Sequence, residues 1–270
     1  MKKISLPIIF ILLIAIWQCS EDNTTEPTSG GQNLNKGSIR LVLIDSPSTL
    51  DSIVICISRV EVHKSGTDTT SGSWTVINDS LRYFDLLLLN NGASAVLGDT
   101  SLTEGTYTQI RLIVEDRNYV VDDGVNYPLT IPSGTQTGIK LNHSFEIESG
   151  KLYELFLDFN VDKSVKITGN GKYKLKPTIR VMPVVISGSI FGQVLPLDAD
   201  PTVWTVSGTD TISTFTDLTG FFKLMALPEG IYDINITPAD TLVYRDTTIT
   251  GVNVFANQNT DIGSITLETR

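Results

Sequence analysis

Asp158, Asn160 and Asp162 place oxygen-bearing side chains at alternate positions of one short segment. Carboxylate and amide oxygens are preferred ligands of calcium, and an EF-hand loop begins with this spacing. The loop is incomplete, because Lys163 stands where the tight turn needs glycine and Gly169 stands where a bidentate glutamate belongs. The three residues are therefore candidates for a weak calcium site at a strand end. The alternative is a metal-free strand whose apolar residues alternate inward.

Catalysis by a serine or cysteine nucleophile needs a histidine base beside it, and the chain has only His63 and His143. The sequence contains neither a Gly-x-Ser-x-Gly elbow nor a phosphate-binding Gly-x-x-x-x-Gly-Lys-Ser/Thr loop. We expect both histidines at the surface. Cys56 lies in an apolar run and is expected to pack as a small hydrophobe. No catalytic residue is predicted, and no cofactor apart from the weak calcium candidate.

Two carboxylates held about 5–10 Å apart in a cleft could hydrolyse a glycoside. Asp116, Asp122 and Asp123 flank a predicted hairpin, where acidic residues usually serve turns and solubility. A glycoside hydrolase is therefore a distant alternative.

Aromatic rings on a β-sandwich can stack on the apolar faces of sugars. The rings available for this are those of Trp74, Trp204, Tyr119, Tyr127 and Tyr244. Trp74 is expected in the core, because Val76 shares its face of a strand. Trp204 and Tyr244 are the better candidates for exposed, ligand-binding rings, although a core position is the favoured interpretation for each.

The start of the chain carries a secretion signal. Lys2 and Lys3 precede an apolar run over residues 4–17, which is too short for a spanning helix of about 20 residues. Next comes Ile16-Trp17-Gln18-Cys19, which resembles the lipobox of bacterial lipoproteins. This resemblance implies that Cys19 becomes the lipidated first residue; an ordinary cleaved signal with an incidental cysteine is the alternative.

Residues 20–33 carry no apolar side chain apart from Pro27 and are predicted to be a solvated tether. Ser20-Glu21-Asp22 resembles the acidic surface-export signal of Bacteroidetes lipoproteins. We therefore expect an outer-membrane lipoprotein of the cell envelope, facing the surface or the periplasm. Its partners would be the membrane, reached through the N-terminal lipid, and a glycan or an envelope protein.

The composition agrees with an acidic globular protein. Twenty Lys plus Arg stand against 30 Asp plus Glu, a net charge of −10, which is the wrong sign for nucleic-acid binding. Cleavage before Cys19 would remove Lys2 and Lys3 and take this charge to −12. Such a chain would be held at a membrane by lipid and not by charge.

From residue 36 onward, short runs of β-branched and aromatic residues alternate with turn residues. Residues 83–90 and 94–99 depart from this pattern, the first as a candidate helical turn. Pro183 interrupts the strand pattern within residues 181–187, because proline cannot donate a ladder hydrogen bond. The expected organisation is a signal peptide (1–18), a tether (19–35) and two β-sandwich domains (36–183 and 184–270).

Residues 37–183 resemble the DUF4382 family of secreted and lipid-anchored bacterial proteins. The motifs that carry the resemblance are Gly37-Ser38-Ile39-Arg40-Leu41, Ile44-Asp45-Ser46-Pro47, Val60-Glu61-Val62-His63, Trp74, Asp85-Leu86-Leu87, Asn91-Gly92, Gly105-x-Tyr107-x-Gln109-Ile110-Arg111-Leu112, Ile131-Pro132-Ser133-Gly134, Gly138-Ile139-Lys140-Leu141 and Leu175-Lys176-Pro177. The resemblance implies an immunoglobulin-like β fold in an envelope protein and brings no settled activity.

Residues 184–270 resemble the carboxypeptidase regulatory-like, transthyretin-like sandwiches. The motifs are Ile186-Ser187-Gly188-Ser189-Ile190, Val203-Trp204-Thr205-Val206, Thr216-Asp217-x-x-Gly220-Phe221-Phe222, Leu227-Pro228-x-Gly230-x-Tyr232 and Ile262-Gly263-Ser264-Ile265. Modules of that family accompany enzymes without catalysing a reaction. The sequence thus predicts an all-β, non-enzymatic, lipid-anchored protein with a binding or structural role. A carbohydrate-binding component of a surface glycan-uptake system is the alternative.

Overall fold

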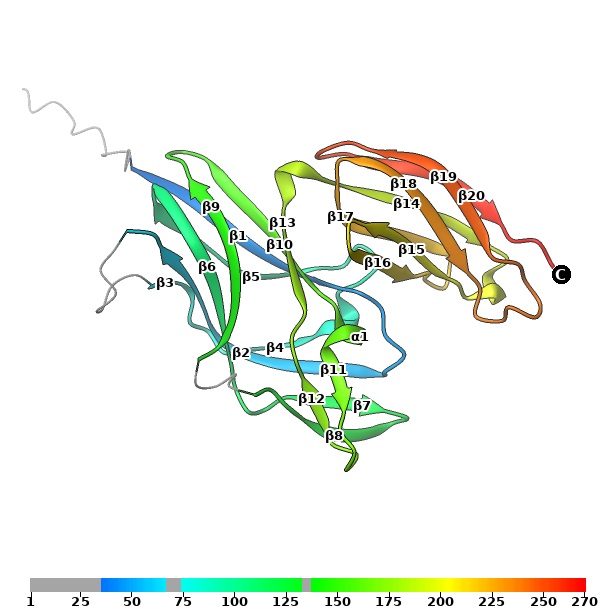
Figure 1. The fold of residues 1–270 in the computed structure, drawn as a ribbon, viewed down its shortest axis with the longest axis horizontal. Coiled ribbons are helices and arrows are strands. Elements are labelled where there is room, and N and C mark those ends of the chain that lie inside the picture. Colours follow the sequence, from blue (N-terminus) through cyan, green and yellow to red (C-terminus); the bar gives the residue numbers. More distant parts are fainter. Residues whose placement is uncertain (1–34, 67–73, 133–136) are drawn as a thin grey trace, which may run out of the picture. The chain divides into compact units, whose positions relative to one another are not determined.

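The computed structural model describes residues 35–66, 74–132 and 137–270. They belong to one compact unit, residues 34–270, and they are built almost entirely of β-strands (Figure 1). Cys19, the lipobox and the tether lie outside the described residues. Within the described ranges, no helix is long and apolar enough to cross a bilayer.

The first sandwich comprises strands β1 to β13 in two sheets. The smaller sheet has the order β13 (Ile179–Pro183), β10 (Leu152–Phe159), β1 (Lys36–Asp45), β5 (Ala95–Thr103). Strand β1 pairs in parallel with β10 and antiparallel with β5. This central position buries most of β1.

The larger sheet is arranged around the long strand β2 (Ser52–Lys64). Its order is β11 (Val165–Ile167), β12 (Tyr173–Leu175), β8 (Val125–Thr130), β7 (Tyr119–Asp122), β2, β6 (Gly105–Val114), β9 (Ile139–Ile147), while β3 (Trp74–Asn78) and β4 (Arg82–Asp85) also pair with β2. A four-residue helix, α1 (Val161–Ser164), joins β10 to β11, and a 3-10 turn, η1 (Leu86–Leu88), follows β4.

The second sandwich comprises seven strands. One sheet has the order β17 (Phe221–Pro228), β14 (Ser187–Leu195), β20 (Asn259–Thr266), and the other has the order β16 (Asp210–Phe215), β15 (Thr202–Ser207), β18 (Gly230–Thr237), β19 (Thr247–Val254). The short turns η2 (Val184–Ile186) and η3 (Leu197–Ala199) flank β14.

Each sandwich has its own apolar core. Alternate residues of β1, namely Ile39, Leu41 and Leu43, pack into the first core, while Phe222 and Leu224 of β17 belong to the second. This alternation is what the two-residue period of a strand requires. The all-β prediction is therefore confirmed.

Two local expectations met different outcomes. The candidate helical turn in residues 83–90 is confirmed only for the 3-10 turn Leu86–Leu88, where the Asp85 side chain accepts a hydrogen bond from the Leu87 amide. Residues 95–99 belong to strand β5, so the expectation that residues 94–99 leave the strand pattern is wrong. Pairing with β1 supplies the hydrogen bonds that local propensity alone did not indicate.

Candidate functional site

A small apolar cluster joins the two sandwiches. Val42 and Ile44 lie on the face of β1 opposite the first core, and there they pack with Ala226 of β17. Phe156, Met182 and Met225 pack against the same cluster. Strand β1 is therefore buried on both faces near its C-terminal end, which explains its nearly unbroken apolar run.

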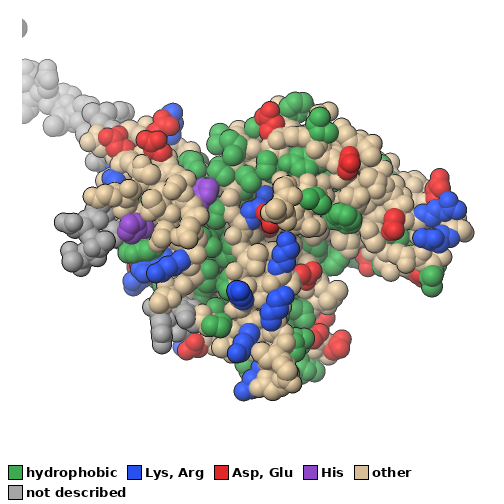
Figure 2. All heavy atoms as spheres, viewed as in Figure 1, with side chains coloured by type: hydrophobic (Ala, Val, Ile, Leu, Met, Phe, Trp, Pro, Cys, Tyr) green, Lys and Arg blue, Asp and Glu red, His purple; other side chains and the backbone are tan. Residues whose placement is uncertain are grey.

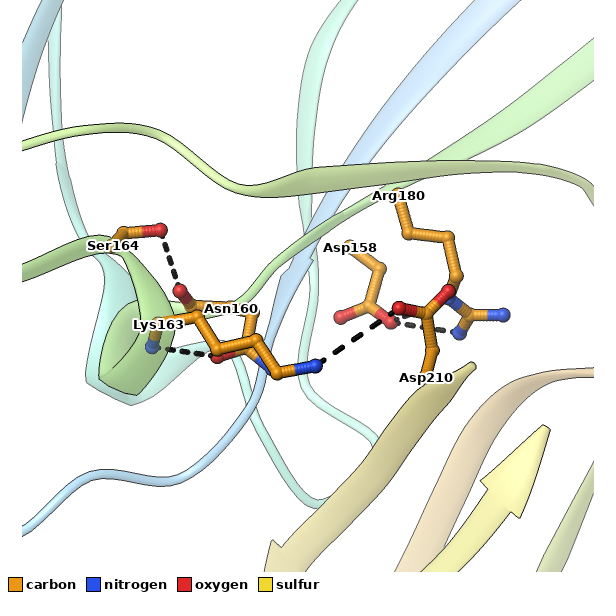
Figure 3. A network of polar contacts seen from close by, with 6 residues as sticks. All are labelled: Asp158, Asn160, Lys163, Ser164, Arg180 and Asp210. Atoms are coloured by element: carbon orange, nitrogen blue, oxygen red, sulfur yellow. Dashed lines mark hydrogen bonds and ion pairs between the residues drawn. The ribbon is translucent and has the colours of Figure 1, made fainter. Parts of the chain in front are cut away.

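A buried ion pair lies beside this cluster. Asp158 and Arg180 are cross-strand neighbours on β10 and β13, and Arg180 donates to Asp158 Oδ2 from Nε at 3.1 Å and from Nη2 at 2.7 Å (Figure 3). Burial raises the pKa of Asp158 above its usual value, and the Arg180 guanidinium opposes that rise. Arg180 Nη1 also donates to the Ala226 carbonyl oxygen at 2.9 Å, so one side chain links both sandwiches.

The Ala226 carbonyl is available because β17 bulges at this point. The pairing of β14 with β17 shifts register between Gly188 and Ile190, and Ala226 has a left-handed backbone with φ of 54°. A bulge of this kind takes one residue out of the ladder and redirects its groups. The bulge thus frees a carbonyl that accepts the Arg180 hydrogen bond.

Helix α1 supplies a second polar link. Asn160 caps this helix, its Oδ1 accepting from the Lys163 amide at 2.9 Å, while the Ser164 hydroxyl donates to the Asn160 carbonyl (Figure 3). The cap holds Lys163 so that its Nζ lies 4.0 Å from Asp210 of β16. Both groups are about half exposed, so this pair stabilises the junction little.

The turn after η1 makes a third link. Asn91 has a φ of 51°, which asparagine tolerates better than most residues, and Gly92 follows with a φ of 92°. The Asn91 side chain donates to the Phe221 carbonyl at 3.1 Å and accepts from the Lys223 amide at 2.6 Å. Asn91 therefore pairs with β17 much as a strand residue would.

A cavity of about 20 Å³ lies within this junction. It is lined by Ile44, Asp45, Ser46, Leu89, Asn90, Asn91 and Asp158 of the first sandwich and by Ile212, Ser213, Thr214, Lys223 and Met225 of the second. Asp45 is only 7% exposed, and neither of its carboxylate oxygens has a hydrogen-bond partner. Burial raises the pKa of Asp45 well above its usual value.

Sequence reasoning did not single out Asp45. An aspartate that ends an apolar strand and precedes Ser46-Pro47 has the composition of an ordinary turn. Residues of both sandwiches, far apart in the sequence, line the cavity beside this carboxylate.

Of the calcium candidates Asp158, Asn160 and Asp162, only Asp158 lines this cavity. Asp158 Oδ2 accepts from Arg180, Asn160 Oδ1 accepts from a backbone amide, and Asp162 is exposed in the first turn of α1. Within the described ranges, no group of three or more His, Cys, Asp or Glu side chains is placed to hold a metal ion.

The aromatic candidates separate into buried and accessible rings. Tyr244 is 8% exposed, belongs to the second core and donates from its hydroxyl to Asp198 at 2.9 Å, so it has the core position favoured for it and is not accessible as a stacking ring. Trp204 is half-buried and lines a shallow depression of about 610 Å³ with Ile231, Asn235 and others. Tyr119 and Tyr127 are also half-buried, and Tyr127 packs against Tyr173 at 5.1 Å between ring centroids.

Trp74 is not a core residue, which corrects the expectation drawn from Val76. Ile77 is the residue of β3 that joins the core, while Val76 is 42% exposed. The Arg111 guanidinium lies 4.0 Å from the Trp74 ring centroid, and His63 meets the ring edge. A cation–π contact on the outer face thus replaces the burial expected for a sandwich tryptophan.

The remaining chemically capable side chains lie apart or have structural partners. His63 is half-buried and shares a hydrogen bond with Thr108, and His143 is half-buried on β9, where burial lowers its pKa. Neither is fully at the surface as expected. Cys56 is fully buried, as predicted.

The hairpin aspartates have different surroundings. Asp122 accepts a hydrogen bond from the Tyr173 hydroxyl, which raises the pKa of Tyr173 to about 12. Asp116 and Asp123 are exposed, and Asp123 forms the turn with a φ of 49°.

A basic strip contrasts with the acidic composition. Figure 2 shows Lys and Arg side chains gathered on one face over the region of α1, β11 and β12. The exposed lysines of this segment are Lys163, Lys166, Lys172, Lys174 and Lys176. An anionic group could approach this face despite the net charge of the chain.

Comparisons with known proteins identify one family. No curated protein matches the chain. Among solved structures, the minor pilin GBS52 of Streptococcus agalactiae is 11% identical over 86% of this chain and 96% of its own, with a TM-score of 0.25. A variant of the shaft pilin spaA of Lactobacillus rhamnosus GG is 7% identical over 86% and 98%, with the same TM-score.

A chain of a type II cohesin–X-dockerin complex from Acetivibrio cellulolyticus is 21% identical, with a TM-score of 0.25. The match covers 30% of this chain and 58% of that one. These likenesses carry no functional argument. The family described as "Domain of unknown function (DUF4382)" matches residues 36–177. This match covers more than half of the chain, which therefore belongs to the DUF4382 family.

Proposed function

We propose that this chain is a lipid-anchored protein of the bacterial cell envelope with a non-catalytic binding or structural role. The observation that carries the proposal is Cys19 at the end of a signal-like apolar run, followed by the polar residues 20–33. Lipid on Cys19 would hold the chain at a membrane, and the polar segment would separate it from the folded residues.

The structure supports a surface-presenting role for the folded part. An apolar cluster, Arg180 and Asn91 tie the two sandwiches together, so residues on both can face one partner in a fixed arrangement. Two of the least exposed carboxylates form ion pairs between neighbouring strands, Asp158 with Arg180 and Glu61 with Arg111. The second sandwich would act as the non-catalytic accessory module that its resemblance to carboxypeptidase regulatory-like domains implies.

Replacing Cys19 tests the anchor. Cys19→Ala should release the protein from the membrane fraction without unfolding it, because the substitution removes the thiol that would carry the lipid and leaves the residues of both apolar cores unchanged. Fractionation of cells followed by circular dichroism of the released protein measures both effects. Cys56→Ala is the matched control and should stay in the membrane fraction. Retention of Cys19→Ala at the wild-type level would contradict lipid anchoring.

Glycan binding is the second candidate, and the depression at Trp204 favours it. Trp204 lies there with exposed Ile231 and the polar side chains of Asn235 and Thr248, a mixture of apolar and hydrogen-bonding groups that suits a sugar. Its indole Nε1 donates to Thr237 Oγ1 at 3.3 Å, which holds the ring in place. A fixed ring loses little conformational entropy on binding.

A glycan array on the full chain in detergent tests this candidate. Trp204→Ala should weaken binding by about 1–3 kcal/mol, the usual cost of a well-packed aromatic contact. Tyr83→Ala, which removes a half-exposed ring on the other sandwich, is the control and should leave binding unchanged. If no glycan is retained by the wild type, a protein partner becomes the favoured ligand. Turnover of a polysaccharide would overturn the non-catalytic role itself.

A further inference from the structure

Asp45 is a buried carboxylate without a partner. Its side chain is 7% exposed, both of its oxygens lack hydrogen bonds, and it faces the cavity of about 20 Å³ at the junction. Burying an ionised carboxylate costs several kcal/mol unless a counter-charge or hydrogen bonds compensate it. The buried Asp45 carboxylate therefore needs a counter-charge or hydrogen-bond donor beyond those that the described residues give it.

Neighbouring donors are committed elsewhere. The Ser46 amide donates to the Phe159 carbonyl at 3.1 Å, and Asp45 uses its own amide to bond the Leu89 carbonyl at 2.8 Å. The amides of Ser46 and Val161 lie near enough to lower the pKa of Asp45, but neither makes a hydrogen bond of normal geometry with it. Lys223 lines the cavity without forming an ion pair with Asp45.

The charges around the cavity leave a negative excess. The carboxylates there are those of Asp45, Asp158, Asp162 and Asp210, and the cations are Arg180, Lys163 and Lys223. Arg180 is committed to Asp158, and Lys163 lies closest to Asp210. Asp158 and, to a smaller extent, Asp162 repel the Asp45 carboxylate, and a positive ion would relieve this repulsion.

The cavity also fits a bare ion and offers oxygen ligands. A volume of about 20 Å³ exceeds the roughly 10–15 Å³ that one water-sized occupant needs, and it is too small for an ion with its hydration shell. Ser46, Asn90, Ser213 and Thr214, which all carry side-chain oxygens, line the same cavity as Asp45.

We propose that Asp45, together with the neutral oxygens of this cavity, binds one calcium ion at the junction of the sandwiches. Calcium accepts irregular sets of six to eight oxygen ligands, whereas magnesium demands a regular octahedron and keeps its water. The ligands come from both sandwiches, since Asp45 ends β1 and Ser46 follows it, while Ser213 and Thr214 lie on β16. The ion therefore links the two modules at a point where the protein alone leaves a charge unpaired.

Calcium titration of the full chain in detergent tests the proposal. After treatment with EDTA, added calcium should give saturable, one-to-one binding by isothermal titration calorimetry. It should also raise the melting temperature by about 5–10 °C at a hundredfold excess over Kd. Magnesium at the same concentration should change the melting temperature by less than half as much. Absence of calcium binding to the wild type would overturn the proposal.

Asp45→Asn tests whether the ion binds at this cavity, through its effects on calcium affinity and on the melting temperature without calcium. The variant should bind calcium at least tenfold more weakly. Without calcium it should melt no lower than the wild type, because a neutral amide is cheaper to bury than a carboxylate. Asp116→Asn, an exposed aspartate converted in the same way, should bind calcium like the wild type.

Other outcomes would contradict the assignment. If Asp45→Asn keeps wild-type affinity, the ion binds elsewhere. If calcium stabilises neither protein and Lys223→Met lowers the melting temperature of the wild type but not of Asp45→Asn, then Lys223 is the counter-charge and the cavity holds only water. If Asp45→Asn fails to fold, Ser213→Ala takes its place, with calcium affinity expected to fall several-fold.

Discussion

Removing Arg180 should destabilise the protein strongly, because it leaves Asp158 buried without its partner. The two side chains are only 15% and 10% exposed. Arg180→Met deletes two charge-assisted hydrogen bonds to Asp158 and the bond to the Ala226 carbonyl. Breaking a buried pair by removing one partner costs about 3–5 kcal/mol of unfolding free energy.

The double variant Arg180→Met, Asp158→Leu separates charge from packing. It removes both charges and keeps apolar volume, so only the Ala226 carbonyl is left unpaired, at a cost of about 1–3 kcal/mol. Urea unfolding of the full chain in EDTA measures each free energy, with Arg245→Met as the control. Arg245 is 58% exposed and lies 3.9 Å from Glu268, so its removal should cost less than about 1 kcal/mol.

The effect of pH provides an independent check. The folded-state pKa of Asp158 is already raised, and losing Arg180 removes the group that opposes the rise. A carboxyl with a raised folded pKa favours folding below its unfolded pKa of about 3.9, and this contribution is lost as pH rises. The penalty of Arg180→Met should therefore be larger at pH 8 than at pH 4. If Arg180→Met lowers the unfolding free energy by less than about 1 kcal/mol at pH 8, this explanation is wrong. It is also wrong if the double variant loses as much unfolding free energy as Arg180→Met and Asp158→Leu lose in sum.

Two further results are expected. Residues 34–183 and 186–270, expressed separately, should each fold into a strand-rich protein by circular dichroism, because each retains its own core. Both should melt below the full chain, since Val42, Ile44 and Ala226 become exposed. Failure of both to fold would mean that one shared core spans the chain. Tyr173 should ionise near pH 12 in an absorbance titration at alkaline pH. Asp122→Asn should move the pKa of Tyr173 toward the ordinary value of about 10, because the carboxylate that stabilises the neutral phenol is gone. An unchanged titration would contradict the hydrogen bond as the cause.

Strand positions could be predicted wherever a local signal was present. Gly220 has a φ of 78° directly before β17, a conformation that glycine adopts without a steric penalty. Asn91 and Gly92 have positive φ in the turn after η1, which asparagine and glycine tolerate. Both features depend on backbone preferences of a few consecutive residues, which the sequence displays directly.

The junction could not be predicted, because its contacts join residues far apart in the chain. Asn91 bonds Phe221 across 130 positions, and nothing in a turn motif indicates which strand will lie beside it. Trp74 shows the same limit: a period of two assigns Val76 to its face but does not say which face is covered. Tyr244 is buried through its single bridge to Thr269 and its bond to Asp198, both outside regular strands.

The mass of the N-terminal peptide from membrane-extracted protein tests the proposed anchoring most directly. We expect a mature chain that begins at Cys19 and carries a diacylglyceryl or triacylated modification on that residue. An unmodified N-terminus at any other residue would contradict it, because residues 20–33 then have no anchor to extend from and the envelope role loses its principal support.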